Sequence, residues 1–364
     1  VRSGDLQTKG YTYILANDID LTGYIWEPIS STDGNLTTTF QGTFDGAGHT
    51  IRGLYTDTSS FVSGHNYAGL FGLLNNATIK NLTIEESYVK GLSNVAGIAG
   101  SAFENTLIQN CVNNATVVGN TQVAGIVGEV FNSSIIENCV NYGEIIGVNT
   151  THPIFGVTVY PIRIAGIAAF VREPKNTIGV INCVNYGDIL ASNTATQVGG
   201  VVALQDCGII INSANFGNVS GESNVGGIIG LNSGKNARVI NCYTAGRVLG
   251  TDKYVGAVAG RNESDDGYVL QCYYLAGSAT CNGANRNGMG TEKGSLTDGE
   301  KGYKVASFTS PESALSRDCG YGTEDLMSVL TAFVDEYRKT NDAPISYWIE
   351  GTDGYPIPIN LPQR

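Results

Sequence analysis

The chain has 364 residues, of which 48 are glycine, 42% are hydrophobic and only 15% are charged. This composition favours short β-strands joined by tight turns and excludes a mainly helical protein, because glycine supplies turn conformations that other residues avoid. The formal net charge of −12 excludes a general nucleic-acid surface, which requires a basic patch that neutralises phosphates. We therefore expect no nucleic-acid partner.

Membrane insertion is not expected from the hydropathy of the chain. No apolar run approaches the length of about eighteen residues that a membrane-spanning helix requires. The chain begins at Val1 without a signal sequence, so we expect a trimmed ectodomain or a fragment.

The first residues are predicted to form a cap, and a repetitive structure follows them. An open end of such a structure exposes unpaired strand edges, so residues 1–40 are assigned as the N-terminal cap. The first trace of the repeat is Thr50–Leu54, which returns 28 residues later as Thr78–Leu82.

Residues 41–278 carry three features that recur in a fixed order. An apolar step with small residues occurs at 67–72, 95–100, 123–128, 164–169, 198–203, 225–230 and 255–260. Asn-Cys-Val-Asn stands at 110–113, 138–141 and 182–185, with weaker forms at 212–215, 241–244 and 271–274. The third feature is Gly-x-Ile or Gly-x-Val, which begins at Gly143, Gly187, Gly217 and Gly246.

The period of this repeat predicts a right-handed single-stranded parallel β-helix, an all-β solenoid with three short strands per coil. A four-stranded propeller blade needs roughly 40 residues and fits less well. Equivalent residues of successive coils should stack about 4.8 Å apart as ladders around an interior of Ile and Val. The expected ladders are amides at Asn110, Asn138, Asn182, Asn212 and Asn241, and aromatic rings at Tyr142, Tyr186 and Phe216.

The C-terminal part departs from the repeat. Insertions at 148–163 and 171–177 are expected to be loops on one side of the solenoid. The period ends near residue 278, and residues 279–364 are predicted to form a capping region. A helix is predicted near 323–338 with Thr323 as its N-cap, and its apolar face is expected to close the cylinder. That face comprises Leu326, Val329, Leu330, Phe333 and Val334.

The repeat resembles the GLUG repeat of bacterial surface and secreted proteins. The likeness covers residues from about 13 to 358 and is carried by Gly69-Leu70-Phe71-Gly72, Asn17-Asp18-Ile19-Asp20-Leu21 and Gly354-Tyr355-Pro356, among other segments. It implies the β-helix fold, an adhesin-like role, and a location outside the cell or on the cell wall or surface. Some proteins with this repeat are metallopeptidases, but the chain lacks His-Glu-x-x-His, so that activity is not carried over.

The histidines and cysteines are interpreted as structural. His49, His65 and His152 stand far apart without partners at metal-ligand spacing, so no metal site and no cofactor are predicted. Cysteines at one ladder position would have Cβ atoms about 4.8 Å apart, beyond the roughly 3.8 Å that a disulfide prefers, so buried thiols are predicted. A disulfide between Cys281 and Cys319 is left open. The ladder cysteines are Cys111, Cys139, Cys183, Cys242 and Cys272.

Stacked carboxylates are the residues to weigh for catalysis, because polysaccharide lyases and hydrolases also use this fold. Glu144 and Asp188 occupy equivalent positions one coil apart and are the candidate catalytic pair of an enzyme. The next coils carry Asn218 and Arg247 at this position, so a solvated structural face is the favoured interpretation.

Aromatic residues after the apolar step are the candidates for ligand binding. Phe103, Phe131, Tyr160 and Arg172, together with the column just after the apolar step, could line a carbohydrate-binding groove, since aromatic rings stack on sugar faces. That column comprises Leu73, Ser101, Glu129, Phe170, Leu204, Leu231 and Arg261. Packing within the core and loops is the favoured alternative for these residues.

We therefore predict a noncatalytic structural or adhesive module, expected to be a monomer, whose partner is a glycan or a host-surface protein. The alternatives are a glycan-processing β-helix enzyme, either a polysaccharide lyase or a glycoside hydrolase, and a carbohydrate-binding module without turnover.

Overall fold

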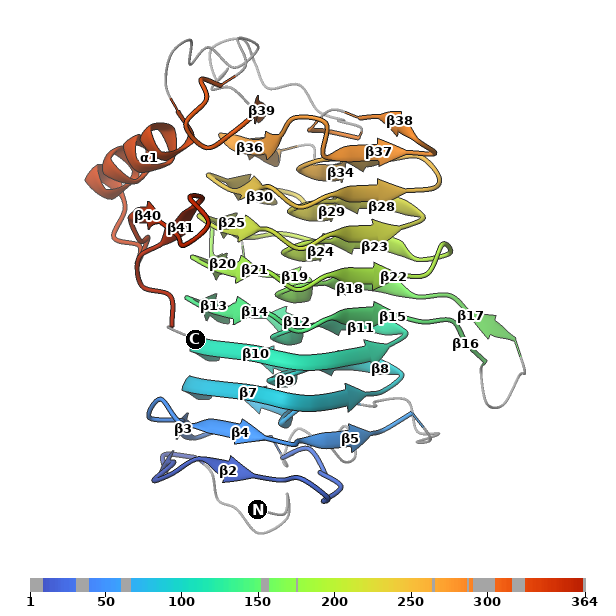
Figure 1. The fold of residues 1–364 in the computed structure, drawn as a ribbon. Coiled ribbons are helices and arrows are strands. Elements are labelled where there is room, and N and C mark those ends of the chain that lie inside the picture. The colour runs from blue at the N-terminus through green and yellow to red at the C-terminus, as the bar shows by residue number, and fades with distance from the viewer. Residues whose placement is uncertain are drawn as a thin grey trace.

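The computed structural model describes residues 9–30, 39–59, 67–151, 157–174, 176–263, 266–286, 288–290, 305–315 and 325–362. The chain forms a right-handed parallel β-helix of about nine turns, and 51% of the described residues lie in strands or isolated bridges. Figure 1 shows the coils stacked along one axis, with helix α1 (Leu326–Thr340) beside them. In the described part of the chain, no helix has the length and apolar character needed to cross a membrane.

Each complete coil passes through three parallel sheets, which we name C, B and A in the order that the chain enters them. In the fourth coil, β11 (Thr121–Ala124) belongs to sheet C and β12 (Val127–Phe131) to sheet B. Sheet A then receives β13 (Ile135–Glu137), β14 (Val140–Asn141) and β15 (Ile145–Gly147). This coil therefore has five strands in place of the three predicted, and Asn138, with a left-handed backbone at φ 51°, lies between β13 and β14.

The remaining strands repeat this path. Sheet C contains β8 (Ser93–Ala96), β18 (Ile162–Ala165), β23 (Thr196–Gly199), β28 (Ser223–Gly226) and β33 (Val255–Gly256). Sheet B contains β6 (Phe71–Asn75), β9 (Ala99–Phe103), β19 (Ala168–Arg172), β24 (Val202–Gln205), β29 (Ile229–Asn232) and β34 (Ala259–Asn262).

Sheet A extends over the whole length of the solenoid. It contains β1 (Thr12–Ile14), β2 (Ile19–Asp20), β3 (Thr43–Asp45), β4 (Thr50–Arg52), β5 (Tyr55–Asp57), β7 (Thr78–Lys90), β10 (Leu107–Gly119), β20 (Ile178–Ile181), β21 (Val184–Asn185), β22 (Ile189–Ala191), β25 (Ile209–Ile211), β26 (Ala214–Asn215), β27 (Val219–Gly221), β30 (Arg238–Ile240), β31 (Tyr243–Thr244), β32 (Val248–Gly250), β35 (Tyr268–Leu270), β36 (Cys272–Leu275), β37 (Ala279–Cys281), β38 (Ala284–Asn285) and β39 (Val305–Phe308).

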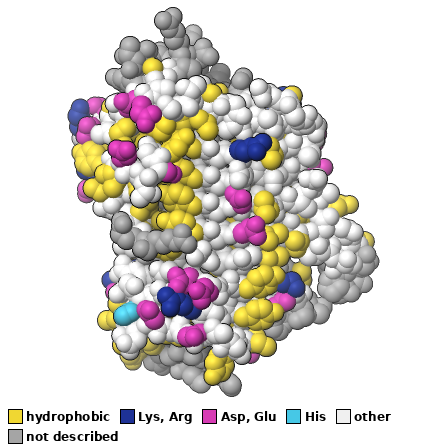
Figure 2. Space-filling view, in the orientation of Figure 1, with side chains coloured by type: hydrophobic (Ala, Val, Ile, Leu, Met, Phe, Trp, Pro, Cys, Tyr) yellow, Lys and Arg dark blue, Asp and Glu magenta, His cyan; other side chains and the backbone are white. Residues whose placement is uncertain are grey.

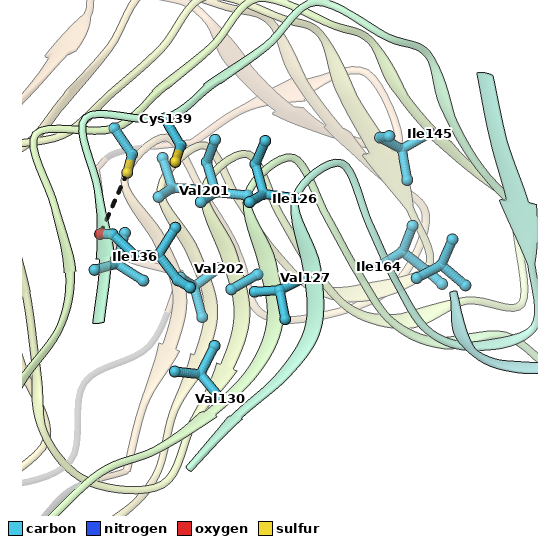
Figure 3. Close-up of a cluster of buried hydrophobic side chains, with 14 of the residues drawn as sticks. Ile126, Val127, Val130, Ile136, Cys139, Ile145, Ile164, Val201 and Val202 are labelled. Atoms are coloured by element: carbon cyan, nitrogen blue, oxygen red, sulfur yellow. Dashed lines mark hydrogen bonds between the residues drawn. The ribbon is translucent and has the colours of Figure 1, made fainter. Parts of the chain in front are cut away.

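The interior is the predicted ladder of apolar side chains. Figure 3 shows Ile126, Val127, Ile145 and Ile164 pointing toward one another, and all four are fully buried. The five ladder cysteines are buried and free, as predicted, and the Cys139 thiol donates to the carbonyl of Glu137 at 3.3 Å. Cys281 is also a free thiol, and Cys319 lies outside the described residues.

The predicted amide ladder is present along most of its length. Asn182 Nδ2 donates to Asn138 Oδ1 at 3.0 Å, Asn212 to Asn182 at 2.8 Å and Asn241 to Asn212 at 2.9 Å. The bond between Asn138 and Asn110 is missing, because Asn138 Nδ2 donates to Glu137 Oε1 at 3.4 Å. The ladder resumes below it, where Asn110 donates to Asn81 at 3.2 Å. We call this column of outward-facing amides the outer amide ladder.

A second, fully buried ladder runs through the other Asn of the repeated motif. Asn113 donates to Asn141 at 2.8 Å, Asn141 to Asn185 at 2.7 Å and Asn185 to Asn215 at 2.7 Å. The apolar step packs directly against it, since a Cβ on Gly125 would lie 2.3 Å from Asn141 Oδ1. This close approach explains why the apolar step carries a glycine at this position.

The predicted aromatic stack is also confirmed. Ring centroids of Tyr142 and Tyr186 are 4.9 Å apart, those of Tyr186 and Phe216 are 4.8 Å apart, and both pairs are within 6° of parallel. Tyr355 from the C-terminal segment packs edge-on against Phe216.

The stacking extends into both segments that were predicted as caps. In the N-terminal segment, β1 pairs with β3 and β2 pairs with β4, both in parallel. In the C-terminal segment, β39 pairs in parallel with β36. Coil-like pairing therefore begins before residue 41 and recurs after residue 278.

The two insertions lie at different corners of the coil, so the prediction that both form loops on one side of the solenoid was wrong. The first insertion follows β15 of sheet A and forms an antiparallel hairpin of β16 (Thr150–Thr151) and β17 (Thr158–Val159), which projects at the right in Figure 1. The second insertion follows β19 of sheet B, where the chain turns into sheet A.

The helix lies on the flank of the solenoid, so the expectation that it closes the cylinder was also wrong. Leu326, Val329, Leu330 and Val334 are buried in a second apolar cluster, distinct from the interior, that includes Tyr243 on the outer surface of sheet A. Apolar residues on this outer surface need cover from water, and the helix and the hairpin of β40 (Trp348–Glu350) and β41 (Pro356–Pro358) provide it (Figure 1).

The helix N-cap also differs from the prediction. Asp325 is the N-cap, and its carboxylate accepts the backbone N–H of Ser328 at 2.8 Å. Thr323, the predicted cap, lies outside the described residues.

Candidate functional site

The outward surface of sheet B carries different residues on successive coils, in contrast to the repeated interior. Strand pairing aligns two columns there, which together we call the sheet B face. The first column comprises Leu73, Ser101, Glu129, Phe170, Leu204, Leu231 and Arg261. The second comprises Asn75, Phe103, Phe131 and Arg172, followed by Asp206, whose carboxylate binds Arg172.

Aromatic and cationic side chains meet in the middle of the sheet B face. The ring of Phe131 packs edge-on against Phe170, with centroids 5.5 Å apart. Two guanidinium groups lie over the Phe170 ring, with Arg163 at 4.6 Å and Arg172 at 5.1 Å from its centroid. Arg172 also pairs with Asp206 at 2.8 Å. Phe170 is only 6% exposed, so a ligand would reach the half-buried ring of Phe131 and the exposed guanidinium group of Arg172. An aromatic ring beside a guanidinium donor suits a planar or hydroxylated ligand.

A half-buried carboxylate, Glu129, adjoins this cluster. Asn94 Nδ2 donates to it at 2.8 Å, and Gln122 donates to its other oxygen. Burial raises the pKa of Glu129, while the two amide hydrogen bonds and the nearby Arg163 oppose that shift. The carboxylate is thus bonded by Gln122 of its own coil and by Asn94 of the preceding coil, so its hydrogen bonds have a structural explanation.

A second buried carboxylate, Glu173, closes the turn after β12. It is 2% exposed, and it accepts the backbone N–H groups of Ser133 and of Ser134, the latter at 3.2 Å. Burial raises the pKa of Glu173 to about 7, against the lowering effect of those bonds. It continues a ladder of turn acceptors, since Ser134 Oγ accepts the N–H of Thr106 at 3.2 Å one coil below.

The structure brings together only part of the predicted ligand-binding set. Phe131 and Arg172 are paired residues of β12 and β19, and Phe103 ends β9 beside them. Tyr160 is 55% exposed and lies just after β17, where the chain approaches sheet C, at the other end of the coil from Phe131. Tyr160 therefore does not join the others, because the insertion that carries it leaves from a different corner. Phe170, from the predicted column after the apolar step, belongs to the cluster, and so does Arg163, which was not among the predicted residues.

The predicted catalytic pair lies on the outer surface of sheet A. Glu144 and Asp188 precede paired residues of β15 and β22, so they are stacked on adjacent coils. Glu144 is exposed, and Asp188 Oδ1 accepts the backbone N–H of Asn218 at 2.8 Å and its amide at 3.0 Å. Hydrogen bonding of Asp188 to the next coil fits the solvated structural face.

The histidines and acidic groups give no evident metal site in the described ranges. His49 Nδ1 lies 3.1 Å from Asp18 Oδ1 at the surface, while His65 and His152 lie outside the described residues. Within the described part, no group of three or more His, Cys, Asp or Glu side chains is arranged to hold a metal ion.

Comparison with known proteins gives a fold relative and a short sequence match. No family model matches the chain. An alignment over 88 residues, which covers 22% of the chain, is 34% identical to a "Putative Gly-rich membrane protein" of Evansella cellulosilytica and covers only 9% of that protein. The crystal structure of a "putative immunoglobulin A1 protease" from Bacteroides ovatus is 19% identical, with a TM-score of 0.52 over 97% of this chain and 86% of the other. The likeness between the two structures shows the β-helix fold and nothing finer.

Proposed function

We propose that the chain is a noncatalytic structural or adhesive module of a bacterial secreted or cell-surface protein, and that its sheet B face binds a glycan. The observation that carries the proposal is the cluster of Phe131, Phe170, Arg163 and Arg172 on an otherwise repetitive solenoid. A rigid β-helix holds such side chains at fixed positions, which lowers the entropy lost when a ligand binds.

The location outside the cell is part of the proposal. It is supported by the resemblance to GLUG-repeat proteins and by a β-helix relative from Bacteroides ovatus that covers most of the chain. The protease activity that the name of this relative suggests is not proposed for this chain, because a likeness at 19% identity concerns the fold alone.

A glycan array is the experiment that tests binding at the sheet B face. Labelled protein should bind a subset of glycans, and Phe131→Ala or Arg172→Met should lower that binding at least tenfold. Leu249→Ala serves as the matched control, because Leu249 is also a surface residue of the solenoid, 38% exposed, but lies on sheet A. Equal binding by all three variants, or no binding by the unaltered protein, would reject the proposal.

The second candidate function is a glycan-processing enzyme that uses Glu144 and Asp188. It is favoured by one observation, the stacking of these carboxylates on adjacent coils. A screen for reducing or unsaturated ends released from acidic and neutral polysaccharides tests it. Release that is abolished by Glu144→Gln or Asp188→Asn would establish the enzyme and overturn the noncatalytic proposal.

A further inference from the structure

The outer amide ladder binds the backbone of the C-terminal segment. Asn182 Nδ2 donates to the carbonyl of Pro344 at 2.8 Å, and Asn212 Nδ2 donates to the carbonyl of Ser346 at 3.0 Å. The backbone N–H of Ser346 donates back to Asn182 Oδ1 at 3.0 Å. The ladder thus contacts main-chain groups and no side chain in these three bonds.

The spacing of these bonds places two main-chain carbonyls on successive rungs. Pro344 and Ser346 are two residues apart. The chain turns tightly at Pro344, where the N–H of Ile345 donates to the carbonyl of Ala343 at 2.8 Å, and then runs along the ladder. Their carbonyls meet Asn182 and Asn212, which are consecutive rungs. Because each asparagine has a left-handed backbone, with φ 55° at both, its carboxamide is held outward in the same orientation on every rung. A ladder of this kind recognises extended backbone with little dependence on sequence.

The same ladder continues beyond the C-terminal segment into an open hollow. Asn81 and Asn110 line this hollow, which has a volume of about 520 Å³, together with Asp45, Thr83, Asn360 and others. Asn360 belongs to the C-terminal segment and is fixed there by its amide, which donates to Ser346 Oγ at 3.1 Å. The hollow is therefore continuous with the surface on which the chain's own extended segment lies. We call it the ladder hollow.

An unsatisfied acceptor marks the ladder hollow. Asn110 donates its amide to Asn81, but its buried Oδ1 has no hydrogen-bond partner. In the pattern of the ladder the donor to this oxygen would be the amide of Asn138, which bonds to Glu137 at 3.4 Å instead. A ligand that brings an N–H to this point therefore forms a hydrogen bond that the fold leaves unmade. On the higher rung of Asn182, the equivalent oxygen accepts both the next amide and the N–H of Ser346.

The remaining lining favours a peptide over a sugar. None of the described residues that line the ladder hollow is aromatic, so the hollow lacks the ring face on which a pyranose stacks. The carboxylate of Asp45 is paired with Lys80 at 3.3 Å and accepts one N–H of the Asn81 amide at 3.0 Å. Each carboxamide has two N–H groups, so the amides retain donors for a ligand. Figure 2 shows acidic and basic side chains gathered together over the lower coils on this side of the molecule.

We propose that the ladder hollow is a docking site for an extended peptide segment of a partner protein, whose backbone N–H and C=O groups bind Asn110 and Asn81 as Ser346 binds Asn182 and Asn212. This inference is independent of glycan binding, because it uses the outer surface of sheet A and not the sheet B face. The binding mode resembles strand addition, in which main-chain bonds provide affinity.

The test uses the intact protein and a phage-displayed library of random dodecapeptides. Selected peptides are synthesised with a fluorescent label, and their affinity is measured by fluorescence polarisation. Thr83→Tyr should weaken binding at least tenfold by filling the hollow, and Asn110→Asp should weaken it similarly by removing the amide donor. Ser220→Tyr is the matched control, since Ser220 is a half-buried residue of the same sheet outside the hollow, and it should bind as the unaltered protein does.

A second control tests the backbone mode. Methylation of alternate backbone nitrogens in a selected peptide removes N–H donors without changing its side chains, and it should weaken binding at least tenfold. Failure to select any peptide, or affinity that is unchanged by Thr83→Tyr or by N-methylation, would overturn the proposal. Displacement of the peptide from the hollow by a neutral oligosaccharide such as cellohexaose would overturn it in favour of a sugar site.

Discussion

The interior of the solenoid and the sheet B face share the same coil geometry, but residue types repeat from coil to coil in the interior and vary on the sheet B face. Inside, each ladder position keeps one chemical type, such as Ile or Val, a thiol, or the buried amides of Asn113, Asn141, Asn185 and Asn215. On the sheet B face, one column changes from Leu73 to Glu129 to Phe170. A residue type that repeats from coil to coil therefore indicates a position where stacking determines the residue. A residue type that varies indicates a position where stacking does not determine it.

Breaking the buried amide ladder should have the largest effect on stability. Asn185→Leu would leave the carbonyl oxygen of Asn215 and the carbonyl of Gly187 without this donor, and would remove the partner of one N–H of the Asn141 amide, which keeps its bond to the carbonyl of Gly143. At about 1–3 kcal/mol for each of these three buried groups, the free energy of unfolding should fall by roughly 3–9 kcal/mol. Urea unfolding followed by circular dichroism measures the change.

An asparagine on the outside of the same sheet provides the control for that experiment. Asn218→Leu alters an exposed amide that bonds Asp188 at 3.0 Å, and its effect should stay near 0.5 kcal/mol. Similar losses for the two variants would contradict the distinction between the interior ladder and the outer surface.

Glu173 marks the point where a ladder of hydroxyl acceptors changes to a carboxylate, and it should make stability depend on pH. The folded-state pKa of Glu173 is raised to about 7 from 4.5, so between these pH values the folded chain binds the proton more tightly than the unfolded chain. The stabilisation is complete below the unfolded pKa and is lost as the pH rises through about 7. The loss amounts to about 3 kcal/mol.

The measurement is a comparison of unfolding free energies at pH 5 and pH 8 for the unaltered protein and Glu173→Gln. The fall between the two pH values should be smaller in the variant by about 3 kcal/mol, since glutamine does not titrate. Parallel pH profiles for the two proteins would show that Glu173 is charged in the fold at pH 5.

The fold could be predicted from the sequence because stacking repeats the same contacts in every coil. The positions of Cys139, Asn182 and Tyr186 in the repeat were sufficient to predict the thiol, amide and aromatic ladders. The period predicts which residues stack on each other in successive coils. It does not predict which residues from different sides of a coil pack against each other in the interior. The contact between Gly125 and Asn141 was missed for that reason.

The placement of the C-terminal helix and of the candidate site depended on non-repeating contacts. An amphipathic helix has one apolar face, and the sequence alone does not tell whether that face covers the end or the flank of a solenoid. Likewise, the pairing of Phe131 with Arg172 follows from strand register, whereas the separation of Tyr160 follows from the corner at which its insertion leaves. The sequence therefore predicted two of these neighbours and misplaced the third.

The cysteine ladder should give an intermediate effect. Cys139→Ser places a hydroxyl among fully buried aliphatic side chains, although it can still donate to the carbonyl of Glu137. The free energy of unfolding should fall by about 1–2 kcal/mol. Cys207→Ser, at a half-buried position outside the ladder, should change it by less than about 0.5 kcal/mol, and a larger change there than at Cys139 would contradict the packing described.

The smallest effect on stability is expected on the sheet B face itself. Arg172 and Asp206 form an ion pair at 2.8 Å whose side chains are 58% and 37% exposed, and exposed pairs of this kind contribute about 0–1 kcal/mol. Arg172→Met keeps the apolar stem over Phe170, so its urea midpoint should stay close to that of the unaltered protein. The variation along the columns of the sheet B face indicates that its exposed residues contribute little to stability. Arg172→Met should then lower ligand binding without lowering the free energy of unfolding. A destabilisation of more than about 2 kcal/mol would instead show that the guanidinium groups hold the face together, and the contrast with the interior would then disappear.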